Sequence, residues 1–408
     1  MVPKGWMLKQ LSDIVKEKIS YGIVQAGPHI PNGIPYIKSS DIRGAIDPAS
    51  LQRTAPEIHY KYRRSAVHPG DIIFSLRGNI GETAIVPSNL LEANLTQGTA
   101  RISVSGDQCN EFYHQQFAMD KLRNYINSLS KGSTFKEISL EELRKVKVLC
   151  APLPEQKKIA QILSAWDKAI TVTEKLLVNS QQQKKALMQQ LLTGKKRLLD
   201  ENGVRFSGEW QRVKLGAIAD MNSGGTPKST VEEYYGGNIP WVSISDMTSN
   251  GKWIATTEKY LTELGLNSSS ARIYPKNSVL YAMYASIGEC SIAAVNLTSS
   301  QAILGIRPKD CLNYEFLYFY LTSLKEKIKL QGQQGTQSNL NAGMVKEFEL
   351  DLPSIREQQK IAAVLSVADA EISTLEKKLA CLRDEKKALM QQLLTGKRRV
   401  KVDEAVAE

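Results

Sequence analysis

The sequence predicts an α/β (α+β) protein with long helices: two mixed α/β domains separated by an antiparallel two-helix coiled coil and related by an internal pseudo-two-fold repeat. Three observations predict this fold class. The chain has 408 residues, which is too long for one ordinary compact domain. A sequence segment in the middle of the chain is repeated near residue 400. Both copies of that segment carry apolar residues at helical spacing over more than four heptads.

The internal repeat organises the chain. Residues 184–195 and 386–397 share the sequence KKALMQQLLTGK at all twelve positions, and residues 155–160 match 357–362 at the same offset of 202. Twelve consecutive identities at a constant offset indicate a tandem duplication. The duplication predicts four segments: a first globular domain (1–150), a central helix (151–199), a second globular domain (200–350), and a C-terminal helix with a tail (351–408).

Each copy of the repeat is predicted to be a long helix. Pro154 suits a helix's first turn, and Gly194 and Gly396 stand where a C-terminal glycine cap is expected. About 40 residues form a helix of roughly 60 Å, whose apolar seam must be covered, most simply by antiparallel pairing of the two copies. The predicted seam residues are Ile159, Leu163, Trp166, Ile170, Leu177, Leu187, Leu191, Ile361, Leu365, Ile372, Leu375, Leu379, Leu382, Leu389 and Leu393.

Charge is unevenly distributed along the chain. The net charge of +11 divides into +5 for residues 1–150, +6 for 151–199, −1 for 200–350 and +1 for 351–408. A basic chain of this size suggests a polyanionic partner such as nucleic acid, with a merely basic soluble protein as the alternative. The basic runs 195–197 and 397–399 fall at the predicted helix ends, where the helix dipole favours cations; phosphate binding is their second interpretation.

The two globular segments repeat more faintly. Short apolar runs punctuated by Gly, Pro and Asn are typical of mixed α/β domains. Matching pieces include 34–37 with 239–242, 80–82 with 287–289, and Trp6 with Trp210. The two copies therefore suggest one scaffold that carries two different binding surfaces.

Catalytic and metal-binding patterns are missing from the sequence. It contains no glycine-rich loop with an Asn/Asp-Pro-Pro-aromatic motif, no G-x-x-x-x-G-K-[ST] loop and no G-x-S-x-G elbow. Residues 154–157 resemble a nuclease ending, but capping and solvation of Glu155 explain them better. The five cysteines and four histidines lack metal-ligand spacing, and no stretch of eighteen apolar residues occurs. We expect a non-catalytic, metal-free, soluble and cytoplasmic binding protein.

The repeated helix resembles a known family. Leu153–Ala160, continued to Leu177 and closed by Leu-Leu-Thr-Gly-Lys, is similar to the conserved helical region of the specificity (S) subunits of Type I restriction–modification systems. The second copy at 352–397 strengthens this resemblance, as do the loops at 132–135 and 335–338. The first copy departs from the family pattern at residues 135–137.

The resemblance implies a role in a larger complex. Each globular domain would be a target recognition domain that reads one half of a split, asymmetric target in double-stranded DNA. The helices would set the spacing and dock two modification (methyltransferase) subunits, and two restriction subunits with nuclease and translocase activity would join them. S-adenosylmethionine, ATP and Mg would bind those partners, leaving this chain without a cofactor.

Candidate DNA contacts are polar and basic residues of predicted loops, because base edges are read by hydrogen-bonding side chains while Lys and Arg hold phosphates. In the first domain they are Lys38, Ser39, Arg43, Arg63, Arg64, Arg77, Asn79, Ser133 and Lys136. In the second domain they are Ser243, Ser245, Lys252, Tyr284, Ser286, Gln333, Gln334, Gln337 and Asn339.

Two questions stay open at this point. The second domain has a net charge of −1, so it must either concentrate its basic residues on one face or rely on partner subunits for phosphate contacts. The competing functions are a self-contained DNA-modifying enzyme and a structural coiled-coil scaffold. DNA methylation that requires both this chain and a co-purifying methyltransferase subunit would separate the three.

Overall fold

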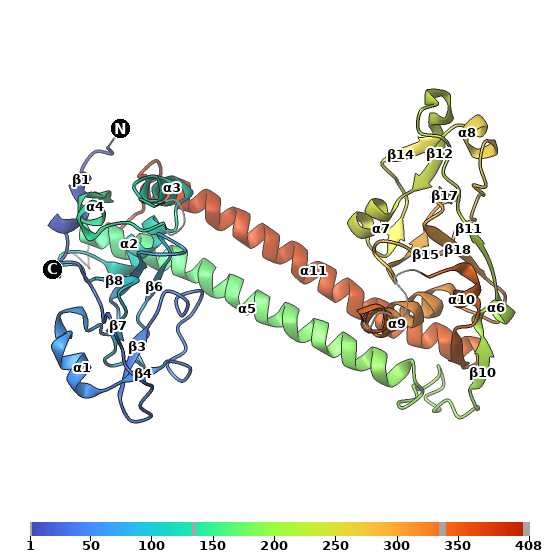
Figure 1. The fold of residues 1–408 in the computed structure, drawn as a ribbon, viewed down its shortest axis with the longest axis horizontal. Helices are drawn as coiled ribbons and strands as arrows, with labels where there is room; N and C mark the ends of the chain where they lie inside the picture. Colours follow the sequence, from blue (N-terminus) through green and yellow to red (C-terminus); the bar gives the residue numbers. More distant parts are fainter. Residues whose placement is uncertain (1, 133–135, 334–339, 403–408) are drawn as a thin grey trace. The chain divides into compact units, whose positions relative to one another are not determined.

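A computed structural model describes residues 2–132, 136–333 and 340–402 (Figure 1). Its contacts divide the chain into two compact units. Unit 1 contains Met1–Glu174 and Lys377–Glu408, and unit 2 contains Lys175–Glu376. Each unit therefore holds one globular domain together with part of both long helices. Among the described residues, no helix is both long and apolar enough to cross a membrane.

Unit 1 is built on three small sheets. Its strands pair in the orders β1 (Met7–Gln10)–β9 (Lys147–Cys150), β2 (Ser20–Tyr21)–β8 (Thr99–Ile102)–β5 (Ile72–Ser75)–β6 (Thr83–Ile85), and β4 (Arg53–Thr54)–β3 (Ile34–Ile37)–β7 (Asn94–Leu95). The shorter helices are α1 (Pro56–Lys61), α2 (Asn110–Phe117), α3 (Asp120–Ser128) and α4 (Leu140–Lys145). All strand pairs are antiparallel except β3–β7, which is parallel.

Strand β5 is buried on both faces, which explains its continuous apolar sequence. Because successive side chains of a strand point to opposite faces, Ile72 and Phe74 lie on one side and Ile73 on the other. Ile72 and Phe74 belong to the main core, which also contains Ile159 of the central long helix. Ile73 belongs to a smaller core with Ile37 of β3. The strand thus lies between the two cores of the domain.

Unit 2 repeats this plan with additions. Its strands pair in the orders β10 (Gln211–Lys214)–β19 (Glu349–Leu352), β11 (Ala219–Ser223)–β18 (Ile303–Pro308)–β15 (Val279–Ala282)–β16 (Cys290–Ala293)–β13 (Trp253–Ile254), and β14 (Lys259–Leu261)–β12 (Tyr235–Val242)–β17 (Thr298–Ser299). The shorter helices are α6 (Leu215–Ile218), α7 (Ile244–Asn250), α8 (Glu263–Asn267), α9 (Tyr314–Gln333) and α10 (Ala342–Lys346). The same strand order in both units shows that the globular domains share one fold.

The two long helices, α5 (Leu153–Leu191) and α11 (Ile355–Leu393), have 39 residues each. In unit 1, Glu174 of α5 bonds Arg383 of α11 at 2.7 Å, and the earlier Asp167 bonds the later Lys386. In unit 2, Ser180 of α5 donates to Glu371 of α11 at 2.9 Å. In each unit, residues later in α5 contact residues earlier in α11. The two helices therefore run antiparallel, as the sequence predicts.

All fifteen predicted seam residues are buried or half-buried in the structure. The helix ends are covered most completely, because they enter the domain cores: Leu163 and Leu393 lie in the core of unit 1, and Leu191 and Leu365 in that of unit 2. Along the rest of each helix, the buried or half-buried seam residues are separated by exposed residues. This pattern is expected for two helices that pack along one apolar face each.

Each long helix carries a buried glutamate in its first turn. In unit 1, the carboxylate of Glu155 accepts the indole N–H of Trp6 at 3.0 Å and two N–H groups of Arg399 at 2.6 and 2.7 Å. The Arg399 guanidinium also lies 5.9 Å from the centre of the Trp6 ring. We call this group the first clasp. It joins the start of the chain, the start of α5 and the basic run that follows α11.

The second clasp repeats this arrangement in unit 2. Glu357 accepts the indole N–H of Trp210 at 3.2 Å and two N–H groups of Arg197 at 2.6 and 2.8 Å. The expectation that Glu155 is a solvated capping residue is therefore wrong, since Glu155 and Glu357 are both buried. The last arginine of each basic run forms an ion pair with a buried carboxylate, an interaction more specific than attraction to a helix dipole.

A buried glutamine follows each glutamate and holds the globular domain. The Oε1 atom of Gln156 accepts the backbone N–H of Cys109 at 2.9 Å, and its Nε2 donates to the carbonyl of Ala151 at 2.7 Å. In unit 2, Oε1 of Gln358 accepts the backbone N–H of Asn313 at 2.8 Å. These bonds hold the beginnings of α2 and α9 against the beginnings of α5 and α11.

We predict that Glu155→Ala lowers the free energy of unfolding by about 2–3 kcal/mol, because it removes charge-assisted hydrogen bonds and leaves the Trp6 N–H without an acceptor. Glu174→Ala is the matched control on the same helix. Its ion pair with Arg383 is exposed and is worth at most about 1 kcal/mol. Denaturant titration of both variants measures the difference, and equal losses would contradict the importance of the clasp.

Candidate nucleic-acid interface

In unit 1, four chain segments meet where strands end. The backbone N–H of Thr96 donates to the carbonyl of Ile37 at 3.1 Å, and that of Leu76 donates to Gly98 at 2.9 Å. The N–H of Ile138 then donates to Leu76 at 3.1 Å. The ends of β3 and β5, the turn between β7 and β8, and the segment around residue 138 therefore lie side by side.

This meeting point presents what we call the first loop surface, made of Lys38, Arg77, Asn79, Gln97 and Lys136. Their side chains are exposed or half-buried. Several are held in place by neighbours: Lys38 donates to Gln52 at 2.9 Å, Arg77 lies 2.9 Å from Glu137, and Asn79 donates to Glu82 at 3.2 Å. Three of its five side chains are cationic and the other two carry amides, and such groups suit contacts with DNA.

Unit 2 forms the same meeting point with equivalent bonds. The N–H of Ser300 donates to Val242 at 2.9 Å, that of Met283 donates to Ala302 at 2.9 Å, and that of Leu340 donates to Met283 at 3.1 Å. We call the exposed or half-buried side chains here the second loop surface: Ser243, Ser245, Tyr284, Ser286 and Gln301. The backbone frame is shared with unit 1, whereas most of the side chains differ.

The repeated sequence motifs build this frame. In both Ile-Gly-Glu motifs the glycine has a positive φ, 86° at Gly81 and 82° at Gly288, which favours glycine. The following glutamates close the same turn, because the N–H of Glu82 donates to Asn79 at 3.1 Å and that of Glu289 donates to Ser286 at 3.0 Å. The Ile-Gly-Glu motif, which is the same in both domains, thus holds Asn79 at the surface of one domain and Ser286 at the surface of the other.

The repeated aspartates have a similar structural role. The backbone N–H of Lys38 donates to Asp41 at 2.9 Å, and that of Ser243 donates to Asp246 at 2.8 Å. Ser243 and Asp246 form a capping box at the start of α7, and Asp246 is buried. These bonds fix the direction in which the chain leaves β3 and β12.

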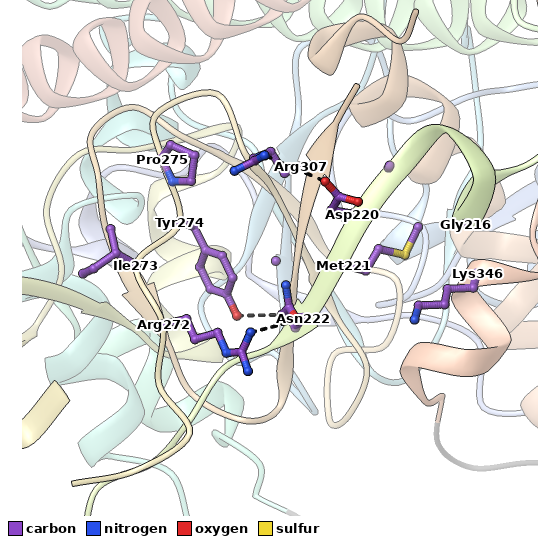
Figure 2. A pocket seen from close by; sticks show the side chains of 12 residues that line it. Gly216, Asp220, Met221, Asn222, Arg272, Ile273, Tyr274, Pro275, Arg307 and Lys346 are labelled. Atoms are coloured by element: carbon purple, nitrogen blue, oxygen red, sulfur yellow. Dashed lines mark hydrogen bonds and ion pairs between the residues drawn. The ribbon is translucent and has the colours of Figure 1, made fainter. Parts of the chain in front are cut away.

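Figure 2 shows an open groove of about 480 Å³ in unit 2, beside β11 and β18. We call it the β11–β18 groove. Its lining residues are Gly216, Ala219, Asp220, Met221, Asn222, Arg272, Ile273, Tyr274, Pro275, Gly305, Arg307 and Lys346. Tyr274 donates its hydroxyl to the carbonyl of Asn222 at 2.9 Å, and the Arg272 guanidinium lies 3.4 Å from the Asn222 amide oxygen. The groove is lined mainly by polar and charged groups.

The sequence comparison decides the family. The model of the Type I restriction modification DNA specificity domain matches residues 3–179 and again residues 207–382. The chain belongs to this family. The two matches agree with the repeat, and they assign the specificity subunit a role in DNA sequence recognition.

Curated relatives agree with the assignment, and a solved structure shares the fold. The specificity subunit of the MjaIX enzyme from Methanocaldococcus jannaschii is 36% identical over 172 residues, a region that spans 41% of this chain and 40% of that protein. The putative MjaX specificity subunit of the same organism is 25% identical over 423 residues, or 98% of this chain and 95% of that one. The S subunit from M. genitalium shares the fold with a TM-score of 0.64 at 16% identity, over 96% of this chain and 99% of that one.

Burial favours the neutral forms of two ionisable groups in unit 1 of the specificity subunit, Cys109 and His114. Burial raises the pKa of the Cys109 thiol to about 11, so that it stays protonated near neutral pH. Burial also lowers the pKa of His114, whose ring lies 2.9 Å from the Thr83 hydroxyl. Within the described ranges, no group of three or more His, Cys, Asp or Glu residues is placed to hold a metal ion.

Several residues predicted as DNA contacts lie away from the loop surfaces. The Lys252 ammonium is 2.8 Å from both Glu315 and Ser366, and it faces the Phe319 ring at 4.6 Å. These contacts hold it against α9 and α11, which makes it the candidate least suited to reach DNA. Arg63 and Arg64 lie on a short helix beside β2.

The remaining candidates are placed as follows. Ser39 is half-buried and Arg43 exposed just after β3. Gln333 ends α9. Ser133, Gln334, Gln337 and Asn339 lie outside the described residues. All the DNA contacts stay predictions.

The structure adds a pair of equivalent residues that the sequence search missed. Gln97 and Gln301 follow Thr96 and Ser300, the two residues that bond the ends of β3 and β12. Equivalent residues of the two domains differ here by 204 in residue number, whereas those of the two helices differ by 202. Applying the helix offset to the domains therefore hides the equivalence of Gln97 and Gln301. A separate alignment of the domains would have found it.

We predict that Gln97→Ala and Gln301→Ala each relax base preference in one half of the target, and in different halves. A glutamine that bonds a base edge supplies about 1–3 kcal/mol of discrimination. Binding titrations on matched and single-base-changed duplexes measure this effect. Gln211→Ala, an exposed glutamine of β10, is the control. If neither substitution changes base preference, the two glutamines do not read bases.

Proposed function

We propose that this specificity subunit reads a split, asymmetric sequence in double-stranded DNA, with each loop surface reading one half. The observation that supports this proposal most strongly is that the two domains share one backbone frame but present different side chains on it. Equivalent positions hold Lys38 and Ser243, Arg77 and Tyr284, and Asn79 and Ser286. Because donors and acceptors at base edges distinguish the base pairs in the major groove, two different sets of side chains predict two unlike half-sites.

We further propose that α5 and α11 set the gap between the half-sites. At 1.5 Å per residue, 39 helical residues extend about 58 Å. The clasps and glutamines attach a globular domain to the start of each helix, so helix length determines where each loop surface is held. Half-site centres roughly one DNA turn apart, about 10 base pairs, fit such a helix pair.

The proposal includes partner subunits. Two modification (methyltransferase) subunits would dock on the helices, and two restriction (nuclease/translocase) subunits would complete the complex. One solved structure of similar fold, with a TM-score of 0.57 at 18% identity, concerns complex assembly and conformational transition of the type I R-M system. S-adenosylmethionine, ATP and Mg would bind to the partners, and this chain would be non-catalytic.

The two other candidate functions are weaker. A self-contained DNA-modifying enzyme needs a reactive centre, but the family match covers both halves of the chain with a specificity domain. A purely structural scaffold does not need two domains with different loop surfaces. The protein's role is tested by mapping DNA methylation in cells with and without the gene. We expect loss of methylation at one bipartite motif, whereas a continuous or palindromic motif would contradict the proposal.

We predict that one added heptad in each helix widens the tolerated gap and leaves both half-site sequences unchanged. Insertions after residues 174 and 376 fall at the boundaries of the compact units, so the ion pairs within each unit are retained. Seven residues lengthen a helix by about 10.5 Å, or roughly three base pairs, and turn it by only about 20°. Methylation mapping of the variant measures the gap. An unchanged gap would contradict the role of the helices.

A further inference from the structure

The β11–β18 groove concentrates positive charge in a segment that is not basic. Residues 200–350 have a net charge of −1. The described residues that line the groove include three cations, Arg272, Arg307 and Lys346, and one carboxylate, that of Asp220. A concave basic site of this kind attracts anions. The groove therefore brings three cations of the second domain together.

The cations of the groove are available to a ligand. Arg307 lies 3.8 Å from Asp220, and their side chains are 65% and 57% exposed. Such an exposed pair is weak, so Arg307 can turn from Asp220 towards a phosphate. Arg272 has a single long contact with a neutral amide, which leaves most of its five N–H donors free for a phosphate.

The wall that carries Arg272 is fixed before any ligand binds. The Tyr274 hydroxyl bonds the carbonyl of Asn222, and the Tyr274 backbone exchanges hydrogen bonds of 2.7 and 3.0 Å with Leu297. The Tyr274 ring lies so close to Gly305 that a Cβ on that residue would be 2.2 Å from it. Because the loop is already ordered, binding an anion there costs little conformational entropy.

Strand β11 and the residues after it connect the groove with the second loop surface. This strand leads from Asp220 in the groove to Ser223, and the chain continues to Thr226, whose hydroxyl oxygen lies 3.4 Å from the backbone N–H of Gln301. Asp220 and Thr226 are at most about 20 Å apart at roughly 3.3 Å per residue. That distance corresponds to about six base pairs, so one duplex can contact both places.

Unit 1 carries arginines over the equivalent strand pair. The β2–β8 ladder of unit 1 corresponds to the β11–β18 ladder of unit 2. The Ser20 hydroxyl donates to the carbonyl of Arg64 at 3.1 Å, and the Arg64 guanidinium lies 6.0 Å from the centre of the Tyr21 ring. Both domains therefore place exposed arginines beside the same ladder, although the residues come from unrelated loop sequences.

We propose that the β11–β18 groove holds backbone phosphates of the DNA duplex whose bases the second loop surface reads. This inference rests on the proposed function and adds the site that supplies sequence-independent affinity in the second domain.

The test is the salt dependence of DNA binding by the full chain assembled with its modification subunits. Binding of a fluorescent duplex that carries the mapped target is compared with binding of a duplex changed in the second half-site. For Arg272→Ala/Arg307→Ala we expect weaker binding to both duplexes by the same factor. The slope of log K against log salt should fall by about 1.8, since each lost phosphate contact removes about 0.9.

Two further variants make the result specific. Arg272→Lys/Arg307→Lys keeps the charge and should keep the slope. Arg205→Ala/Arg212→Ala removes two exposed arginines of unit 2 that do not line the groove, and should leave the slope unchanged. An unchanged slope in the Arg272→Ala/Arg307→Ala variant, an equal fall in the Arg205/Arg212 control, or a defect confined to assembly with the modification subunits would overturn the inference. If the unaltered complex itself shows no preference for the matched duplex, the proposed function fails instead.

Discussion

The structure depends on the burial of a charged residue at the start of each long helix. A carboxylate removed from water destabilises the fold unless it is paired and hydrogen-bonded. Glu155 and Glu357 meet this requirement with a tryptophan from the segment before the domain and an arginine from the run after the other helix. One interaction therefore joins three distant parts of the chain. The neighbouring glutamine then attaches the globular domain, so each domain has a fixed position on its own helix.

A fixed attachment allows the loop surfaces to vary. The hydrogen bonds that hold the four converging segments come from the backbone, and the motifs that repeat between the domains supply turns and caps. Side chains such as those of Arg77 and Tyr284 are exposed and contribute little to the core. A change there alters what the surface can bind without large loss of stability. One fold can thus carry two different loop surfaces, and its second domain places Arg272 and Arg307 in one groove although its net charge is negative.

Much of this fold could be predicted from the sequence, because duplication and helical periodicity are strong signals. The long helices, their antiparallel pairing and the two related domains were all predictable. The clasps were not, because a glutamate in a first helical turn is usually solvated, and its partners lie more than 140 residues away. Lys252 is a cationic residue of the kind that contacts DNA. In the folded chain, however, its ammonium is buried beside Glu315. The β11–β18 groove combines residues from four separate stretches, between Gly216 and Lys346, which no local pattern brings together.

The central claim is that each domain carries its own sequence preference on a shared frame. Exchange of residues 1–150 for those of a relative with a different target tests it most directly. The donor must keep a tryptophan at the position of Trp6, so that the first clasp can form. Methylation mapping of the chimaera should show one half-site replaced by the donor's, with the other half-site and the gap unchanged. A change in both half-sites, or in neither, would contradict the account.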